Sequence, residues 1–413
     1  MKRFKTVFAI MGPGLLMAGA AIGVSHLVQS TRAGADYGLQ LLIIVILVNF
    51  FKYPFFEFGH RYAAATGENL LQGYLRMGKL YLYAFFLLNI VSAIISVAGV
   101  TIVTAGIADY IGGGQQGAVF WSGILLVISV GILVIGHYRW LDLSMKMMMA
   151  VLFVATVAAA ATALWHGPEA VLSTAPSPWT KVGIGFIIAL MGWMPAPVEL
   201  SVWQSLWVQA QSRERGRPVT WREAKIDFNV GYALTIFMAV SFVMMGAYVM
   251  YGSGIVFSNS GAGFAAQLVE LYQKVLGSWS KPVVALAAMA AMFSTVITCV
   301  DAYPRSLAVS LELLFPKLGQ SPRTHHAIWM LVVSAAALVI IMSFASRLKS
   351  LIDLATTIAF LAAPFFAYLN YRLITSAHIP QNMRPHAALR ILAVAGLVFL
   401  KLFGLAYIWV TWL

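Results

Sequence analysis

Long apolar stretches are the feature of this sequence that most constrains its fold. A helix that crosses a bilayer needs about 20 mostly apolar residues, and about eleven stretches meet that requirement. In chain order they cover residues 8–34, 39–63, 80–110, 117–137, 145–166, 182–211, 229–252, 282–303, 326–345, 350–373 and 389–412. We therefore expect an all-α integral membrane protein whose outer surface contacts the lipid bilayer.

The composition excludes most other classes of protein. Hydrophobic residues make up 61% of the chain and charged residues 10%, whereas about 25% of a soluble domain is charged. The single cysteine, Cys299, excludes a disulfide within the chain and a thiolate metal cluster. The sequence contains no H-E-x-x-H and no G-x-S-x-G motif, so we do not expect an enzyme.

The positive charges predict the orientation in the membrane. The formal net charge is +13, and most of the 27 Lys and Arg residues fall in alternate loops. Cytoplasmic loops are enriched in such residues, so we expect a cytoplasmic N-terminus and an outside C-terminus, in the inner membrane of a bacterium. The cluster from Arg213 to Arg217 fits a topology anchor near anionic lipid, and no nucleic-acid partner is expected. Residues 253–280 are interpreted as an outside loop with a short amphipathic helix.

The first and sixth spans are interrupted in matching positions. Gly23 gives the backbone freedom in span one, and Pro195 and Pro197 remove two backbone donors in span six. Broken helices five spans apart are typical of secondary transporters built from two inverted repeats. We expect one transport domain, residues 1–413, with repeats at 1–166 and 182–373, a final helix at 389–412 and the substrate site at the breaks.

Several motifs resemble those of one transporter family. Gly12-Pro-Gly-Leu-Leu opens span one, and Ala33-Gly-Ala, one residue and Tyr37-Gly38 close it. Arg61 followed by Thr66-Gly67, and Met194-Pro195, fit further family positions. Over its whole length the sequence resembles the natural resistance-associated macrophage protein (NRAMP) family of divalent-metal transporters. The resemblance implies a LeuT-like inverted five-plus-five repeat of about eleven helices, alternating access, and no cofactor beyond a coupling proton or cation.

The sequence departs from the family at the metal ligands. The family has Asp-Pro-Gly-Asn in the break of span one, and Gly23 and His26 occupy the Asp and Asn positions here. The family's Met-Pro-His in span six is replaced by Met194, Pro195 and Ala196, with Met191 as a second candidate for the Met ligand. Manganese and iron sites favour carboxylates, so this replacement argues against ordinary Mn or Fe transport.

Other residues near the breaks are candidates for a rebuilt site. Glu199 follows the break of span six and could bind a cation or a coupling proton. His26 could shuttle a proton or bind a substrate, and together with Met194 and Glu199 it could hold a soft metal ion. The remaining candidates for substrate contact are Gly23, Ser25, Gln29, Met191, Trp193 and Ala196.

Charged residues elsewhere in the spans are candidates for coupling or gating. Glu57 and Arg61 are spaced to pair on one helix face, and so are Asp301 and Arg305, which we interpret as an inner gate. We expect Arg32 to pair with Asp36 rather than to attract an anion. Lys52 could reach an interface or meet Glu199, Asp353 could belong to an outer gate, and Asp227 could cap the start of span seven.

Two kinds of substrate and two other functions stay open at this point. A cation substrate predicts that Glu199 is essential, whereas a small polar organic or anionic substrate gives His26 and Arg32 the larger roles. A sensor on the same scaffold is less favoured because the loops are short, and a channel because broken helices suit alternating access. The sequence does not predict the oligomeric state, and a monomer is compatible with it.

Overall fold

All regular secondary structure in the described residues is helical. The structure is a computed structural model that describes residues 12–136, 139–168, 175–318 and 321–412. Lys2, Arg3, Lys5 and the start of the first expected span lie outside these residues. Nine described helices are long and apolar enough to cross a membrane. They are α4 (Leu42–Thr66), α6 (Lys79–Ile111), α7 (Gly117–Ile135), α8 (Arg139–His166), α11 (Trp221–Met245), α13 (Ser280–Leu314), α14 (Pro322–Ser343), α15 (Leu348–Ile374) and α16 (Ala387–Trp412).

The two remaining spans are broken helices, as the sequence predicts. Span one consists of α2 (Pro13–Ala21), a π-helical segment η1 (Ser25–Ser30) and α3 (Thr31–Tyr37). Span six consists of α9 (Lys181–Gly192) and α10 (Leu200–Glu214), with a non-helical segment between them. These pieces and the nine long helices account for the expected spans.

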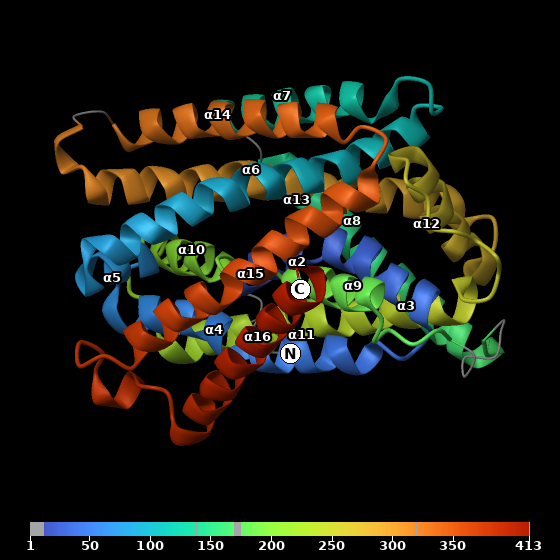
Figure 1. The fold of residues 1–413 in the computed structure, drawn as a ribbon. Helices are drawn as coiled ribbons and strands as arrows, with labels where there is room; N and C mark the ends of the chain where they lie inside the picture. The colour runs from blue at the N-terminus through green and yellow to red at the C-terminus, as the bar shows by residue number, and fades with distance from the viewer. Residues whose placement is uncertain (1–11, 137–138, 169–174, 319–320, 413) are drawn as a thin grey trace, which may run out of the picture.

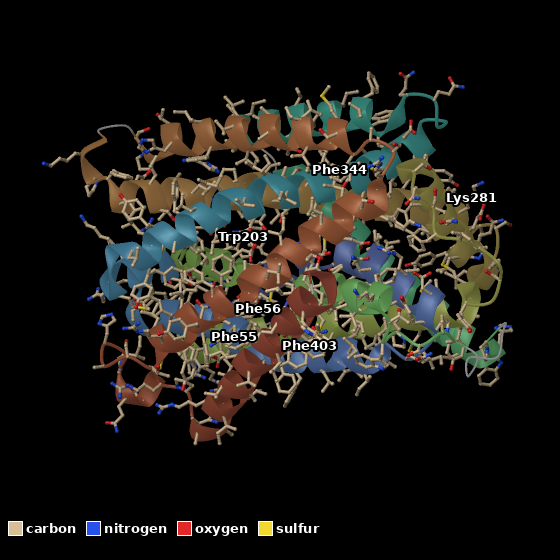
Figure 2. All side chains as sticks on the ribbon, viewed as in Figure 1. Phe55, Phe56, Trp203, Lys281, Phe344 and Phe403 are labelled. Carbon is tan, nitrogen blue, oxygen red and sulfur yellow. The ribbon has the colours of Figure 1, made fainter. Side chains whose placement is uncertain are left out.

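The long helices run roughly side by side, with α15 and α16 crossing obliquely in front of them (Figure 1). The short helices α5 (Leu70–Met77) and α12 (Gly261–Leu276) lie at opposite ends of the bundle (Figure 1). Figure 2 shows Trp203 within the bundle and Lys281 at the end that carries α12. Because α12 buries one face, including Phe264, against α6 and α13, the expected amphipathic helix is confirmed as a cover on this end.

Helix contacts follow the pattern of two inverted repeats. Helix α4 packs against α10, and α11, its counterpart five spans later, packs against α2. Both contacts are backbone-close, because a Cβ built on Gly59 would lie 2.4 Å from the carbonyl oxygen of Ser201, and one on Gly231 would lie 2.0 Å from that of Gly14. Small residues allow such approaches between membrane helices. The paired broken helices are therefore held by equivalent neighbours.

Asp227 connects two helices instead of capping its own. Its carboxylate accepts hydrogen bonds from the backbone N–H groups of Gly12 (3.0 Å) and Gly14 (2.7 Å), at the start of α2. Helix α11 is capped by Thr220 and Glu223. The expectation that Asp227 caps span seven is wrong, because the backbone groups that lack partners at the start of α2 lie within its reach.

Candidate functional site

The break in span one is short and tightly packed. The backbone N–H of Gly23 donates to the carbonyl of Ala21 at 2.8 Å, and the chain then continues as the π-helical segment η1. A Cβ built on Gly23 would lie 3.1 Å from Cγ2 of Thr295 on α13. A carboxylate side chain at this position would therefore displace Thr295.

His26 is bound by the protein on both sides of its ring. Its Nε2 lies 3.0 Å from the carbonyl oxygen of Thr235 on α11, so Nε2 carries a hydrogen and donates. Its Nδ1 lies 2.8 Å from Oγ of Ser25, and that hydroxyl is also within hydrogen-bond distance (3.0 Å) of the carbonyl oxygen of Ala21. The side chain is fully buried. This geometry connects span one to span seven and leaves neither nitrogen directed at a ligand.

The break in span six is bound by a lysine from span two. Helix α9 ends at Gly192, the Met194–Pro195 peptide is cis, and α10 begins at Leu200. Nζ of Lys52 on α4 donates to the carbonyl oxygens of Met191 (2.6 Å), Gly192 (2.9 Å) and Ala196 (3.4 Å). The sequence had left the partner of Lys52 open, and the only signal for this role was a lysine in mid-span.

Glu199 lies on the other side of the same break. Its Oε1 is 3.3 Å from the hydroxyl of Tyr303 on α13, and that hydroxyl is 3.0 Å from Oγ of Ser96 on α6. Its Oε2 is buried and has no hydrogen-bond partner among the described residues. Glu199 interacts electrostatically with Lys52, but the two side chains do not form an ion pair within 4 Å.

A small cavity lies between the two breaks. Its volume is about 30 Å³, enough for about two water molecules. The polar residues that line it are Ser25, Ser96, Thr295, Cys299 and Tyr303, and the apolar ones include Trp193, Ala196 and Trp203. None of the described residues that line it is charged. Of the predicted substrate contacts, Ser25, Trp193 and Ala196 line the cavity, whereas Gly23, His26, Gln29, Met191, Met194 and Glu199 surround the breaks without lining it.

Comparison with known proteins identifies the family. The model of the natural resistance-associated macrophage protein-like (Nramp) family matches residues 14–410. The chain belongs to the Nramp family. A relative in Pasteurella multocida (strain Pm70), described as an uncharacterized protein, is 40% identical over 97% of this chain and 92% of its own length.

Solved structures show the same fold at low sequence identity. A mutant of the Eremococcus coleocola manganese transporter is 16% identical, with a TM-score of 0.75 over 98% of this chain and 87% of that chain. MhsT in complex with L-phenylalanine is 13% identical, with a TM-score of 0.65 over 95% and 98% of the two chains. The family and the fold together make this Nramp chain a LeuT-like secondary transporter.

A polar network in the Nramp chain joins spans one and ten. Arg32 forms an ion pair with Asp353 on α15 at 2.8 Å, and Gln29 accepts from Arg32 and donates to Asp353. The Arg32 guanidinium also lies over the ring of Phe186 on α9, 4.7 Å from its centroid. The expected Arg32–Asp36 pair is wrong, because the closest carboxylate belongs to the neighbouring helix. Three spans therefore meet at this network.

Two ion pairs at the other end of the bundle, Glu57–Arg61 and Asp301–Arg305, differ in their contacts with other parts of the chain. Glu57 and Arg61 pair as predicted, and Arg61 also lies over Trp221 and donates to the carbonyl of Met383. Asp301 and Arg305 pair at 2.5 Å within α13. Both partners of this second pair lie on α13, and Asp301 also contacts α14, where Nε2 of His326 is 3.3 Å from its carboxylate. The inner gate at Asp301 and Arg305 stays a prediction.

The structure does not assemble a metal-ligand cluster from the residues that it describes. In these segments no group of three His, Cys, Asp or Glu side chains is placed to hold an ion. His26 is bound to Ser25 and Thr235, and Glu199 lies beside Tyr303. The set of His26, Met194 and Glu199 suggested by the sequence does not converge on the cavity.

Sequence reasoning gave too little weight to one buried polar pair. His60 on α4 and Gln204 on α10 are fully buried, and neither ring nitrogen of His60 nor either amide atom of Gln204 has a hydrogen-bond partner in the described chain. The spacing of residues within span two could not indicate this pair, because Gln204 lies on a different helix.

Proposed function

We propose that the substrate of this transporter is a small polar solute, and not Mn²⁺ or Fe²⁺, bound in the cavity between the two breaks. The observation that carries this proposal is the lining of the cavity, where the described residues offer hydroxyls, a thiol and two indole rings but no carboxylate. Removing a divalent cation from water without compensating charge is very unfavourable. Hydroxyl groups and aromatic rings suit a small polar molecule.

Access to the cavity would alternate between the two sides of the membrane. The network of Gln29, Arg32 and Asp353 joins spans one, six and ten on one side of the cavity, and we assign it the role of the outer gate. Opening this gate requires the Arg32–Asp353 pair to separate. The cavity volume of about 30 Å³ has room for about two water molecules, so the cavity must widen to admit a larger solute.

Glu199 is our candidate for the coupling proton. It is buried beside a cavity residue, Tyr303, and its Oε2 lacks a partner among the described residues. A buried carboxyl with a free oxygen can take up and release a proton as its surroundings change. We place the transporter in the inner membrane of a bacterium with its N-terminus in the cytoplasm, which the loop charges support.

Uptake by reconstituted protein tests the substrate. Proteoliposomes would be screened with Mn²⁺, Mg²⁺, Ca²⁺, copper and a set of small amino acids, amines and polar organic solutes, with and without a proton gradient. The Eremococcus coleocola manganese transporter is the positive control. We expect saturable uptake of an organic solute and no Mn²⁺ uptake above protein-free liposomes. Saturable Mn²⁺ uptake comparable to the control would contradict the proposal.

Copper in the same screen tests for a soft-metal site, either the predicted set of His26, Met194 and Glu199 or the thiol of Cys299. Cys299 places one thiol in the cavity wall, and a soft ion is the metal that such a ligand would favour. One thiol without further converging ligands is a weak site, so we expect no copper-dependent uptake.

A further inference from the structure

The strongest unexplained feature outside the cavity is the binding of Lys52. Its ammonium group is completely buried and has three N–H donors. Three carbonyl oxygens, of Met191, Gly192 and Ala196, lie between 2.6 and 3.4 Å from Nζ. Within the described part of the chain, no carboxylate lies within ion-pair distance of it. This buried charge is therefore held by backbone carbonyls and not by a salt bridge.

The break of span six makes these carbonyls suited to a cation. Met191 and Gly192 end α9, so neither carbonyl has an α-helical donor four residues later, and that of Met191 accepts a long hydrogen bond (3.4 Å) from the backbone N–H of Met194. The C-terminal end of a helix also carries partial negative charge. Ala196 lies in the unwound segment, and the prolines at 195 and 197 cannot donate to any carbonyl. In transporters with broken helices, half-helix ends and unwound carbonyls of this kind coordinate the coupling ion.

We propose that the break of span six is a monovalent-cation site whose cation is the chain's own Lys52 ammonium, so that no free ion binds there. The ammonium supplies the single positive charge that the carbonyls attract, and its tether keeps the group at the site. This inference concerns the stability of the break and holds whatever solute the cavity carries.

Removing the side chain would leave an empty site with its ligands in place. In Lys52→Ala the three carbonyls keep their positions in α9 and the unwound segment, and the space of the butylammonium group becomes free. A small cation such as Na⁺ or methylammonium could then bind. In Lys52→Met an apolar chain of similar length fills that space, so the same ions would be excluded.

Thermal unfolding of the purified full-length protein in detergent tests whether the vacated site binds a free cation. Each variant is titrated with sodium, potassium or methylammonium chloride against choline chloride at equal ionic strength. We expect Lys52→Ala to unfold about 5 °C below the natural protein in choline, since a buried charge-assisted network is lost. We expect sodium or methylammonium to restore at least half of that loss with a saturating dose response. The natural protein and Lys52→Met should show no such response.

The proposal is overturned if the unfolding temperature of Lys52→Ala does not depend on which cation is added. If Lys52→Ala responds to sodium and methylammonium no more than to choline, the carbonyls do not form a cation site. Asn49→Ala is the matched control, because Asn49 is a buried polar residue one turn earlier on α4. That variant should lose stability without gaining a cation response. If Lys52→Ala is not recovered folded, the same titration of Lys52→Ser decides the question.

Discussion

At the scale of single residues, the surroundings of a side chain change what its position in the sequence suggests. His26 occupies the position of a family metal ligand, yet both ring nitrogens are engaged by Ser25 and Thr235. A buried imidazole bound on both sides supports the structure of the break. Lys52 shows the opposite case, a residue whose partner the sequence left open and which contacts three carbonyls of span six.

Replacing His26 should affect stability before it affects recognition. His26→Ala removes two buried hydrogen bonds and leaves a void, so we expect it to lower the free energy of unfolding by about 2–4 kcal/mol. Chemical unfolding in detergent measures this. His166→Ala is the control, because His166 is exposed on α8, and it should change the value by less than about 0.5 kcal/mol. Unchanged stability of His26→Ala would contradict the structural role.

Replacing Glu199 should reduce the coupling of solute transport to the proton gradient more than it reduces the stability of the protein. Glu199→Gln keeps the length of the side chain and an oxygen for the Tyr303 hydroxyl but cannot exchange a proton. We expect proton-driven accumulation of solute to fall at least about tenfold, which corresponds to 1.4 kcal/mol or more, while solute exchange without a gradient continues.

Parallel uptake and exchange assays separate these effects. Glu270→Gln, an exposed change on α12, should leave both assays unchanged. Gradient-driven accumulation by Glu199→Gln at the natural level would exclude Glu199 as the coupling site.

At the scale of helices, close backbone contacts decide how the broken helices are held. A Cβ built on Gly192 would lie 1.8 Å from the carbonyl oxygen of Thr356 on α15. A Cβ on Gly185, earlier in the same helix, meets nothing within 4 Å. Both changes replace glycine by alanine in α9, so their intrinsic effects on helix formation are similar. Gly192 also ends α9 and binds Lys52 through its carbonyl, which a Cβ does not remove, so the main difference between the two changes is the contact with α15.

Gly192→Ala should therefore be far more damaging than Gly185→Ala. We expect Gly192→Ala to reduce the yield of monodisperse protein severely, because the helices must separate. Gly185→Ala should unfold at the same temperature as the natural protein or slightly above it. Size-exclusion chromatography and thermal unfolding compare the two. Equal behaviour would show that α9 and α15 do not approach each other this closely.

A second prediction for helices concerns the start of span one. Asp227→Ala leaves the backbone N–H groups of Gly12 and Gly14 without their acceptor, and the loss of a capping carboxylate costs about 1–2 kcal/mol. We expect a corresponding decrease in unfolding free energy and faster hydrogen exchange at the start of α2. Asp227→Asn keeps one acceptor oxygen and should lose less. Unchanged exchange at α2 in both variants would contradict this contact.

At the scale of the whole molecule, the bundle is organised so that three spans meet at one polar network. Arg32 on α3, Asp353 on α15 and Phe186 on α9 meet there, and the cavity lies between the same broken helices. The single cysteine, Cys299, lines this cavity and provides a natural reporter of access.

Breaking the network should open the cavity to one side. We expect Arg32→Ala to increase the rate at which a membrane-impermeant maleimide labels Cys299 from the outside by about tenfold, a change of 1.4 kcal/mol in the opening equilibrium. Labelling in oriented vesicles, followed by mass spectrometry, measures the rate. Arg305→Ala, which disrupts a pair within α13, should not change it. Equal labelling rates of Cys299 in both variants would show that Arg32 does not act as a gate residue.

The sequence predicted the positions of the helices well and their side-chain contacts poorly. Apolar length and the glycines and prolines of spans one and six are local properties, so the spans and both breaks were predictable. The partner of Arg32 was wrong because Asp36 is near in sequence, whereas Asp353 is near only after folding. The role of Asp227 was predicted wrongly for the same reason, because its partners Gly12 and Gly14 are near it only after folding. The repeat boundaries at 1–166 and 182–373 stay a prediction.

The sequence by itself determined a membrane bundle and its two broken helices, and its motifs predicted the family. The loss of the family's metal-binding carboxylate is what that resemblance implies. Each follows from the identity or spacing of residues along one chain. Only the tertiary structure decided that His26 is bound on both sides, that none of the described residues lining the cavity is charged, and that Lys52 binds the carbonyls of span six. These contacts join helices far apart in sequence, and which faces meet depends on how the whole bundle packs.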